Sequence, residues 1–178
     1  MENRNKSVIK EFYKIRDVPY RIPLSLEEPD DCCSGKSSRL FKIFTEVGYD
    51  VRYRVCTFLW SDMNLSRELR IIPHEDECTH SYLEVKIENE WKIVDATWDK
   101  SLQGLFTINN WDGKSDTIVA VPVRKCFSTE ESTKIMQESL TEQTIIDDLK
   151  KNGKFYKAFN KWLEGHRKRG KDFLLVQK

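Results

Sequence analysis

The stretch HSYLEVKIENEWKIVDATWD, residues 80–99, decides the fold. Apolar residues occupy alternate positions from Leu83 to Ile87, which is the period of a strand with one buried face. If Glu88 and Asn89 form the loop, the residues on either side of them pair with one another. The second half of the stretch then returns as an antiparallel strand, and the whole stretch is predicted to be a β-hairpin.

The register of this hairpin brings two polar residues together. Counting outward from the loop places Tyr82 opposite Asp95 and His80 opposite Thr97, so His80 and Asp95 are diagonal neighbours on one face. A hydrogen bond from a histidine to a carboxylate fixes the imidazole tautomer and stabilises the imidazolium ion. A slip of one residue would move Asp95 to the opposite face, so the pairing is a sharp prediction.

The segment upstream of the hairpin is predicted to be a helix followed by a strand. Apolar residues at helical spacing run from Leu40 to Val47, and Gly48 follows where a left-handed cap is favoured. Residues 51–60, VRYRVCTFLW, then alternate in the manner of a half-buried strand.

Two adjacent cysteines precede this helix, in the stretch DDCCSGKSSRL at residues 30–40. A thiol at a helix N-terminus lies among unpaired backbone amides, whose partial positive charge stabilises a thiolate. Cys33 is placed to receive this effect, whereas Cys32 points elsewhere. The alternative for Cys33 is a buried thiol that acts only as a small apolar side chain.

Three histidines are candidates for the base that would activate this thiol. His166 lies in the basic run GHRKRGK, which is typical of a solvated helix end, and His74 lies in an irregular acidic loop. His80 alone opens a strand. A metal site made of His74, Cys78 and His80, to which Cys32 and Cys33 could add thiolates, is the chemical alternative, although neither a C-x-x-C nor an H-E-x-x-H spacing is present.

Length, charge and cysteine content indicate the general class of protein. The 178 residues fit one domain, and 30 Lys and Arg against 29 Asp and Glu give no reason to expect nucleic acid or an anionic membrane as partner. The first residues, MENRNKSVIKEFYKIRDV, contain no apolar signal region, and no stretch of about 18 apolar residues follows. Five cysteines are an odd count for a disulfide framework, so we expect reduced thiols and a cytoplasmic protein.

The remaining elements complete an α+β prediction. Residues 6–16 have helical spacing, residues 61–78 are expected to be a loop with one helical turn, and TIVAVPV at 117–123 is predicted to be a strand. From residue 128 onward, helix-forming residues dominate, with interruptions expected at Thr141 and Gly153. We therefore expect a single domain over residues 1–178. Its core spans about 31–123, and a helical extension spans about 128–170.

The quoted stretches CSGKSSRL, GYDVRYRV and HSYLEVKIENEWKIVDATWD together resemble the transglutaminase-like superfamily over about residues 31–99. The resemblance implies a papain-like core in which a Cys-bearing helix packs on an antiparallel sheet. It implies Cys33 as nucleophile, His80 as general base and acid, and Asp95 as the orienting carboxylate. The short chain is similar to the small prokaryotic members. It lacks the calcium loop pattern D-x-[DN]-x-[DN]-G, and no cofactor or metal is expected.

The resemblance implies cysteine-dependent acyl transfer or amide hydrolysis through a thioester, with a peptide, protein or amide as substrate. The alternative from another class is a catalytically silent binding module that keeps the fold. Trp60, Tyr82 and Trp98 are candidates to line the substrate cleft, with core packing as their other role. The oligomeric state is left open.

Overall fold

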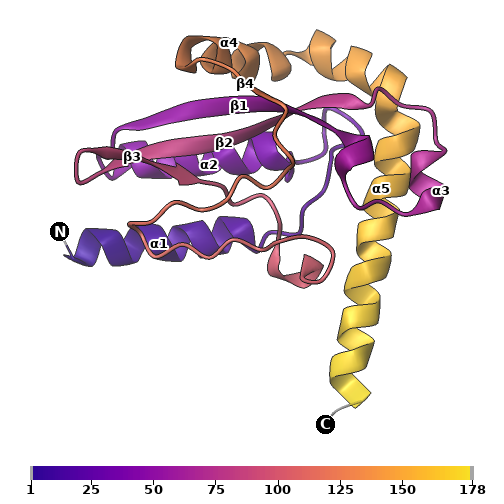
Figure 1. Cartoon of the computed structure of the whole chain (residues 1–178), viewed down its shortest axis with the longest axis horizontal. Helices are drawn as coiled ribbons and strands as arrows, with labels where there is room; N and C mark the ends of the chain where they lie inside the picture. The colour runs from indigo at the N-terminus through magenta and orange to yellow at the C-terminus, as the bar shows by residue number, and fades with distance from the viewer. Residues whose placement is uncertain (1, 177–178) are drawn as a thin grey trace.

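The computed structural model describes residues 2–176, with side chains over 6–169, and it is an α+β arrangement (Figure 1). Its centre is a four-stranded antiparallel sheet in the order β3-β2-β1-β4. The strands are β1 (Val51–Leu59), β2 (Glu77–Ile87), β3 (Glu90–Val94) and the short β4 (Lys125–Cys126).

The hairpin has the predicted register. Ile87 pairs with Glu90 at the loop, and the ladder continues to Leu83 opposite Val94. The two loop residues both have positive φ, 50° at Glu88 and 71° at its neighbour. This is the backbone of a two-residue turn whose twist matches the twist of the flanking strands. The predicted hairpin is therefore confirmed.

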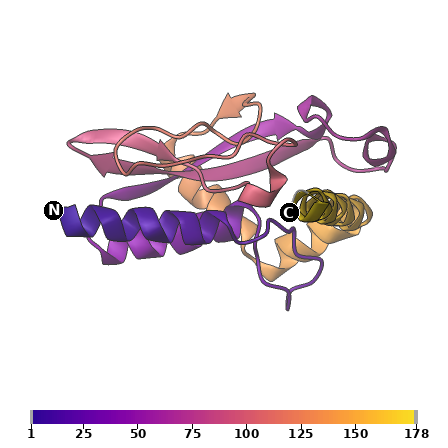
Figure 2. The ribbon, with the colours of Figure 1, turned by 90° about the horizontal axis from the view of Figure 1, so that it is seen from below.

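Two helices, α1 (Glu2–Arg16) and α2 (Cys33–Glu46), lie side by side against one face of the sheet (Figure 2). The buried side chains between them form one cluster: Val8, Phe12, Leu40, Phe44, Leu83, Val85, Val94, Ala96 and Trp111. The predicted end of α2 is confirmed, since Gly48 has φ of 84° and the chain turns there into β1. Cys33 is consequently the first residue of a helix that is fixed to the sheet.

Two C-terminal helices follow, α4 (Thr129–Ser139) and α5 (Glu142–Val176), and α4 packs against β1. The break expected at Thr141 is confirmed. The interruption expected at Gly153 is wrong, because α5 continues through it. A helical glycine costs about 1 kcal/mol relative to alanine, and the nearby burial of Phe155 and Phe159, both 0% exposed, outweighs that cost.

The predicted strand at 117–123 is also wrong. This segment is an extended connection, and a single backbone hydrogen bond, from Thr117 to Ile93, joins it to the edge of β3. Side chains make the other bonds there: Asp116, just before the segment, accepts from the amide of Ile93, and Thr117 Oγ1 accepts from the amide of Asp95. Pro122 supplies no amide to continue a ladder. The strand forms a few residues later, as β4, and pairs with β1 instead.

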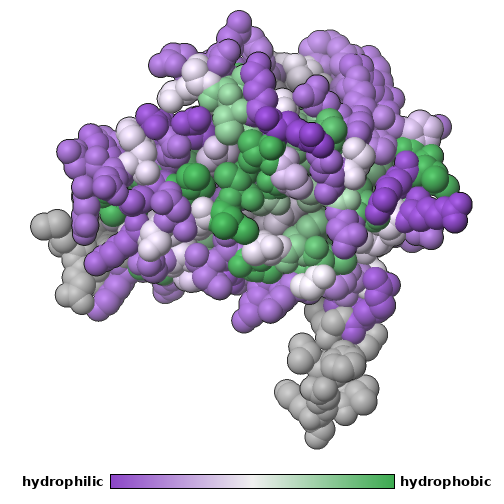
Figure 3. All heavy atoms as spheres, in the orientation of Figure 1, coloured by the Kyte–Doolittle hydropathy of each residue, from purple (hydrophilic) through white to green (hydrophobic). Residues whose placement is uncertain are grey.

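The loop between β1 and β2 contains a short 3₁₀ turn at Trp60–Asp62 and a single helical turn, α3 (Arg67–Arg70), as predicted. Polar side chains cover most of the face in Figure 3, and apolar side chains are exposed in its middle. None of the helices in residues 2–176 has the length and apolar character that crossing a bilayer requires.

Candidate active site

A buried histidine–carboxylate pair lies at the start of β2. His80 is on β2, Asp95 comes directly after β3, and Nε2 of His80 lies 2.8 Å from Oδ2 of Asp95. Their side chains are 2% and 0% exposed. The diagonal pairing predicted from the hairpin is therefore confirmed.

Asp95 is held in place from both sides. Its Oδ1 accepts from the amide of Thr97 at 3.0 Å, and its Oδ2 accepts from the amide of Ala120 at 2.8 Å. Burial raises the pKa of Asp95, but the charge and hydrogen bond of His80, together with these donors, outweigh burial and lower the pKa overall. The carboxylate is therefore ionised, and it is fixed in position for the imidazole.

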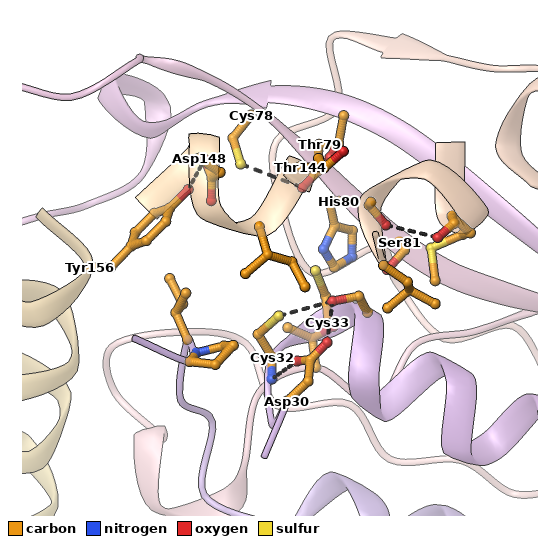
Figure 4. Close-up of a pocket in the computed structure, with 18 of the residues that line it drawn as sticks. Asp30, Cys32, Cys33, Cys78, Thr79, His80, Ser81, Thr144, Asp148 and Tyr156 are labelled. Carbon is orange, nitrogen blue, oxygen red and sulfur yellow. Dashed lines mark hydrogen bonds between the residues drawn. The ribbon is translucent and has the colours of Figure 1, made fainter. Parts of the chain in front are cut away.

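Cys33 lies on the other side of the imidazole, at the first position of α2. Its sulfur is hydrogen-bonded to the ring of His80 and accepts a second hydrogen bond from the backbone amide of Ser81. Because Nε2 of His80 is committed to Asp95, Nδ1 is the nitrogen left for sulfur. Figure 4 shows the thiol directed at the ring. The structure thus brings together all three residues that the resemblance implied.

Two buried side chains of α2 make three hydrogen bonds that fix the helix in place. Lys36 Nζ donates to the carbonyl oxygens of Arg16 at 2.8 Å and Thr97 at 2.9 Å, while Ser37 Oγ donates to the carbonyl of Ser81 at 3.1 Å. Burial lowers the pKa of Lys36 to about 8, although the negative charge of nearby Asp99 acts to raise it. The Ser37 bond holds the helix start, and hence Cys33, against β2, and the Lys36 bonds tie it to the end of α1 and to the segment after β3.

The ionisation of this site favours a thiolate paired with an imidazolium. A hydrogen bond from the Cys32 thiol and the hydrogen bond and charge of His80 lower the pKa of Cys33 well below its ordinary value, although burial opposes them. Burial also lowers the pKa of His80, but the charge and hydrogen bond of Asp95, with those of Cys33, outweigh it and raise the pKa to about 10. At neutral pH the sulfur is therefore negative and the ring positive.

Cys32 has the opposite character. Its hydrogen bond to Cys33 and its burial raise its pKa well above the ordinary value, and its sulfur lies 3.1 Å from Ser34 Oγ. The thiol has one proton, so it donates either to Ser34 or to the neighbouring sulfur. Donation to the thiolate is the stronger bond because its acceptor is charged. The expectation that Cys32 points elsewhere is therefore wrong: its side chain bonds to Cys33 and lines the same cavity, and no spacing rule in the sequence indicates this.

Gly35 allows the close approach that places the two cysteines. A Cβ at this position would lie 1.9 Å from the carbonyl oxygen of Asp30, so only glycine fits. Asp30 in turn accepts from the amide of Cys32 at 2.9 Å and from Ser34 Oγ at 2.7 Å. The loop before α2 therefore folds tightly onto the first turn of the helix.

A cavity of about 400 Å³ opens beside Cys33 and His80 (Figure 4). Trp60 and Trp98, predicted to line a cleft, both border it. Tyr82, the third residue predicted there, does not border this cavity: it lies two residues farther along the face of β2 that carries His80. Its ring is buried and stacks on His80 at a centroid distance of 6.1 Å.

The other histidines lie apart from this site. His74 stacks on Phe155 with ring centroids 4.0 Å apart, and its Nδ1 lies 2.6 Å from the carbonyl oxygen of Ile72. His166 is near the carbonyl of Gln103, at 3.3 Å. Within the part of the chain that the structure describes, no group of three or more His, Cys, Asp and Glu side chains is arranged to hold a metal ion.

No protein-family model, curated protein or solved structure matches this chain.

Proposed function

We propose that the protein is a cysteine-dependent hydrolase or acyltransferase of transglutaminase-like type, with Cys33 as nucleophile. The single observation that supports this most strongly is the buried chain of contacts from Cys33 through His80 to Asp95, ending at a cavity. In this arrangement the thiol of Cys33 has a base, His80, beside it, and the carboxylate of Asp95 orients that base. In the same proposal the helix and sheet form a papain-like core.

The chemistry begins when the Cys33 thiolate attacks the carbonyl carbon of an amide or ester. The first hydrogen bond of α2 runs from the amide of Lys36 to the carbonyl of Cys32, so the amides before it point out of the helix end. In this proposal the backbone amide of Cys33, one of these donors, stabilises the developing oxyanion. The imidazolium of His80 gives its proton to the leaving amine or alcohol, and the acyl group remains on sulfur as a thioester.

The second half of the reaction reverses the role of His80. The neutral ring now removes a proton from water or from a primary amine, which attacks the thioester and releases Cys33. Asp95 stabilises the imidazolium that forms in this step. Hydrolysis and amine transfer share every step up to the thioester, so the acceptor alone distinguishes them.

The first experiment is a burst measurement with 4-nitrophenyl acetate. We expect one equivalent of 4-nitrophenolate per protein molecule before the steady state, and no burst in Cys33→Ala. Cys126→Ala is the matched control, since Cys126 is an exposed cysteine outside the cavity, and it should keep the full burst. A burst that persists in Cys33→Ala would contradict the proposed nucleophile.

The acceptor is identified by adding a primary amine to the same reaction. An acyltransferase gives the acetamide of that amine and a faster steady state, whereas a hydrolase gives acetate at an unchanged rate. His80→Ala should lose the burst at neutral pH in either case.

A further inference from the structure

The wall of the cavity beyond the catalytic residues is formed by the corner between the two C-terminal helices. Met136 and Leu140 lie at the end of α4, and Ile145 and Leu149 lie in the first turns of α5. Figure 4 shows the start of α5 across the cavity from Cys33, with Thr144 and Asp148 marking it. The helical extension therefore encloses the space into which a substrate on Cys33 would project.

This wall is strongly apolar. Aliphatic residues from three other segments complete it, so that a group bonded to Cys33 meets hydrocarbon on several sides. The aliphatic and proline residues that line the cavity are Ile22, Pro23, Leu26, Val55, Val121, Ile135, Met136, Leu140, Ile145 and Leu149. The volume of about 400 Å³ lies within the range of small-molecule sites.

Beyond the Cys33–His80 ion pair, the charged side chains that line the cavity are all acidic. Glu28, Asp30 and Asp148 line it, and among the lining residues within the described chain there is no Lys or Arg. Asp148 Oδ1 accepts from the hydroxyl of Tyr156 at 3.0 Å and from Asn152 at 2.7 Å, so the carboxylate is fixed at the wall. The positive charge of His80 is already shared between Cys33 and Asp95, so an anionic group that enters the far part of the cavity would be repelled by these carboxylates, with no lysine or arginine among the described lining residues to pair with it.

We propose that this cavity selects a neutral aliphatic acyl group of medium chain length, and that the α4–α5 corner is its specificity wall. The transfer of that group to Cys33 rests on the proposed function, whereas the selectivity follows from the apolar and acidic residues that line the cavity. Each methylene group buried on binding increases affinity about fourfold. Longer neutral chains should therefore be preferred until the cavity is full, and chains that end in a carboxylate should be rejected.

The acylation step balances without any further reagent. With an activated ester, the thiolate of Cys33 forms the C–S bond and the C–O bond to 4-nitrophenolate breaks. The proton that His80 carries goes to the leaving oxygen, or to solvent if 4-nitrophenolate leaves as the anion.

The test compares acylation by the 4-nitrophenyl esters of acetate, hexanoate and octanoate and by the 4-nitrophenyl half-ester of glutarate. Each rate is divided by the rate with free glutathione, which removes differences in intrinsic reactivity. We expect octanoate to exceed acetate at least tenfold, and the glutarate half-ester to fall at least tenfold below hexanoate. Equal normalised rates across the four esters would overturn the selectivity.

A charge introduced at the wall tests the assignment of the corner. Ile145 is half-buried and lines the cavity, whereas the adjacent Ile146 is 36% exposed and does not. Ile145→Lys should lower the octanoate rate and raise the glutarate half-ester rate, each at least fivefold. Ile146→Lys is the matched control and should leave both rates within twofold of wild type. Identical effects of the two substitutions would overturn the proposal.

A binding measurement separates this proposal from the catalytic one. Calorimetry with octanamide and Cys33→Ala needs no reaction at sulfur, and we expect saturable binding that Ile145→Lys weakens. If octanamide binds in this way but no ester acylates the wild-type protein, the catalytic function is wrong and the apolar site stands. If the esters acylate Cys33 but octanamide does not bind, the selectivity is wrong and the catalytic function stands.

Discussion

Replacement of Asp95 by asparagine isolates the charge that sustains the ion pair of the site. The pKa of His80 is raised from 6.5 to about 10, a difference that corresponds to about 5 kcal/mol in favour of the imidazolium. The charge and the hydrogen bond of Asp95 are the two largest contributions in that direction. We therefore expect Asp95→Asn to remove more than half of this free energy, about 3 kcal/mol. The equilibrium should then shift about a hundredfold away from the thiolate–imidazolium pair and toward the neutral thiol and imidazole.

The assay is the rate of alkylation of Cys33 by iodoacetamide between pH 4 and pH 10, with each cysteine followed by peptide mass. In the wild type, Cys33 should react at full rate well below the pH at which an ordinary thiol ionises. In Asp95→Asn the midpoint of this profile should rise by about 2 pH units, because the ring loses its positive charge and no longer stabilises the thiolate.

The same substitution has a separate cost in stability. The carboxylate accepts from the amides of Thr97 and Ala120, so an asparagine NH₂ group faces one of these donors in either orientation. We expect a loss of about 1–3 kcal/mol in the free energy of unfolding. Asp99→Asn is the control. Asp99 is equally buried, but it pairs with Arg167, outside the Cys33 site, so its replacement should lower the melting temperature and leave the alkylation profile unchanged.

The reasoning about the ion pair would be refuted if Asp95→Asn kept the wild-type midpoint. It would equally be refuted if Asp99→Asn moved the midpoint as far as Asp95→Asn does.

Three further predictions concern stability. Gly35→Ala should lower the free energy of unfolding by about 2 kcal/mol, because the added Cβ would overlap the carbonyl oxygen of Asp30. Gly153→Ala should raise it by up to about 1 kcal/mol, because the added Cβ would have no neighbouring atom closer than 4.0 Å. Urea unfolding measures both changes. Phe155→Ala should cost about 3–5 kcal/mol, because the ring is 0% exposed between α5 and the core, and a loss below 1 kcal/mol would contradict that docking. The Cys33–His80 pair should stabilise the protein most between about pH 6.5 and 9. Below pH 6.5 the unfolded pair binds two protons and the folded pair only one, so stability falls as the pH is lowered. Above pH 9 the unfolded pair binds no proton while the folded pair keeps the one on His80, so stability falls as the pH is raised. Urea unfolding of wild type and Cys33→Ala across pH measures this difference, and parallel curves would contradict it.

The hairpin and its polar pair could be predicted from sequence because both depend on short-range rules. A period of two and a two-residue loop fix the register, and the register alone brings His80 to Asp95. The position of Cys33 followed in the same way from the helix that begins there. In each case the residues involved are close in sequence or on adjacent strands.

The parts that could not be predicted depend on contacts between distant segments. The edge of β3 is completed by side chains of Asp116 and Thr117, and periodicity does not distinguish this from a strand. The cavity lies at the start of β2 because the corner of α4 and α5 encloses that end. This placement excludes Tyr82 from the cavity and admits Ile145. No local pattern in the C-terminal sequence indicates which helix face meets Cys33.

The most direct test of the central claim is detection of the acyl group on Cys33. Wild-type protein is mixed with 4-nitrophenyl octanoate, quenched in acid within the burst, and analysed as intact protein and as peptides. The account predicts one octanoyl group per molecule, located on the peptide that begins the α2 helix and assigned to Cys33 by fragmentation, and removed by hydroxylamine. It also predicts no octanoyl group on Cys33 in His80→Ala at the same pH. An octanoyl group found on Cys32, or spread over lysines and unaffected by His80→Ala, would contradict the account.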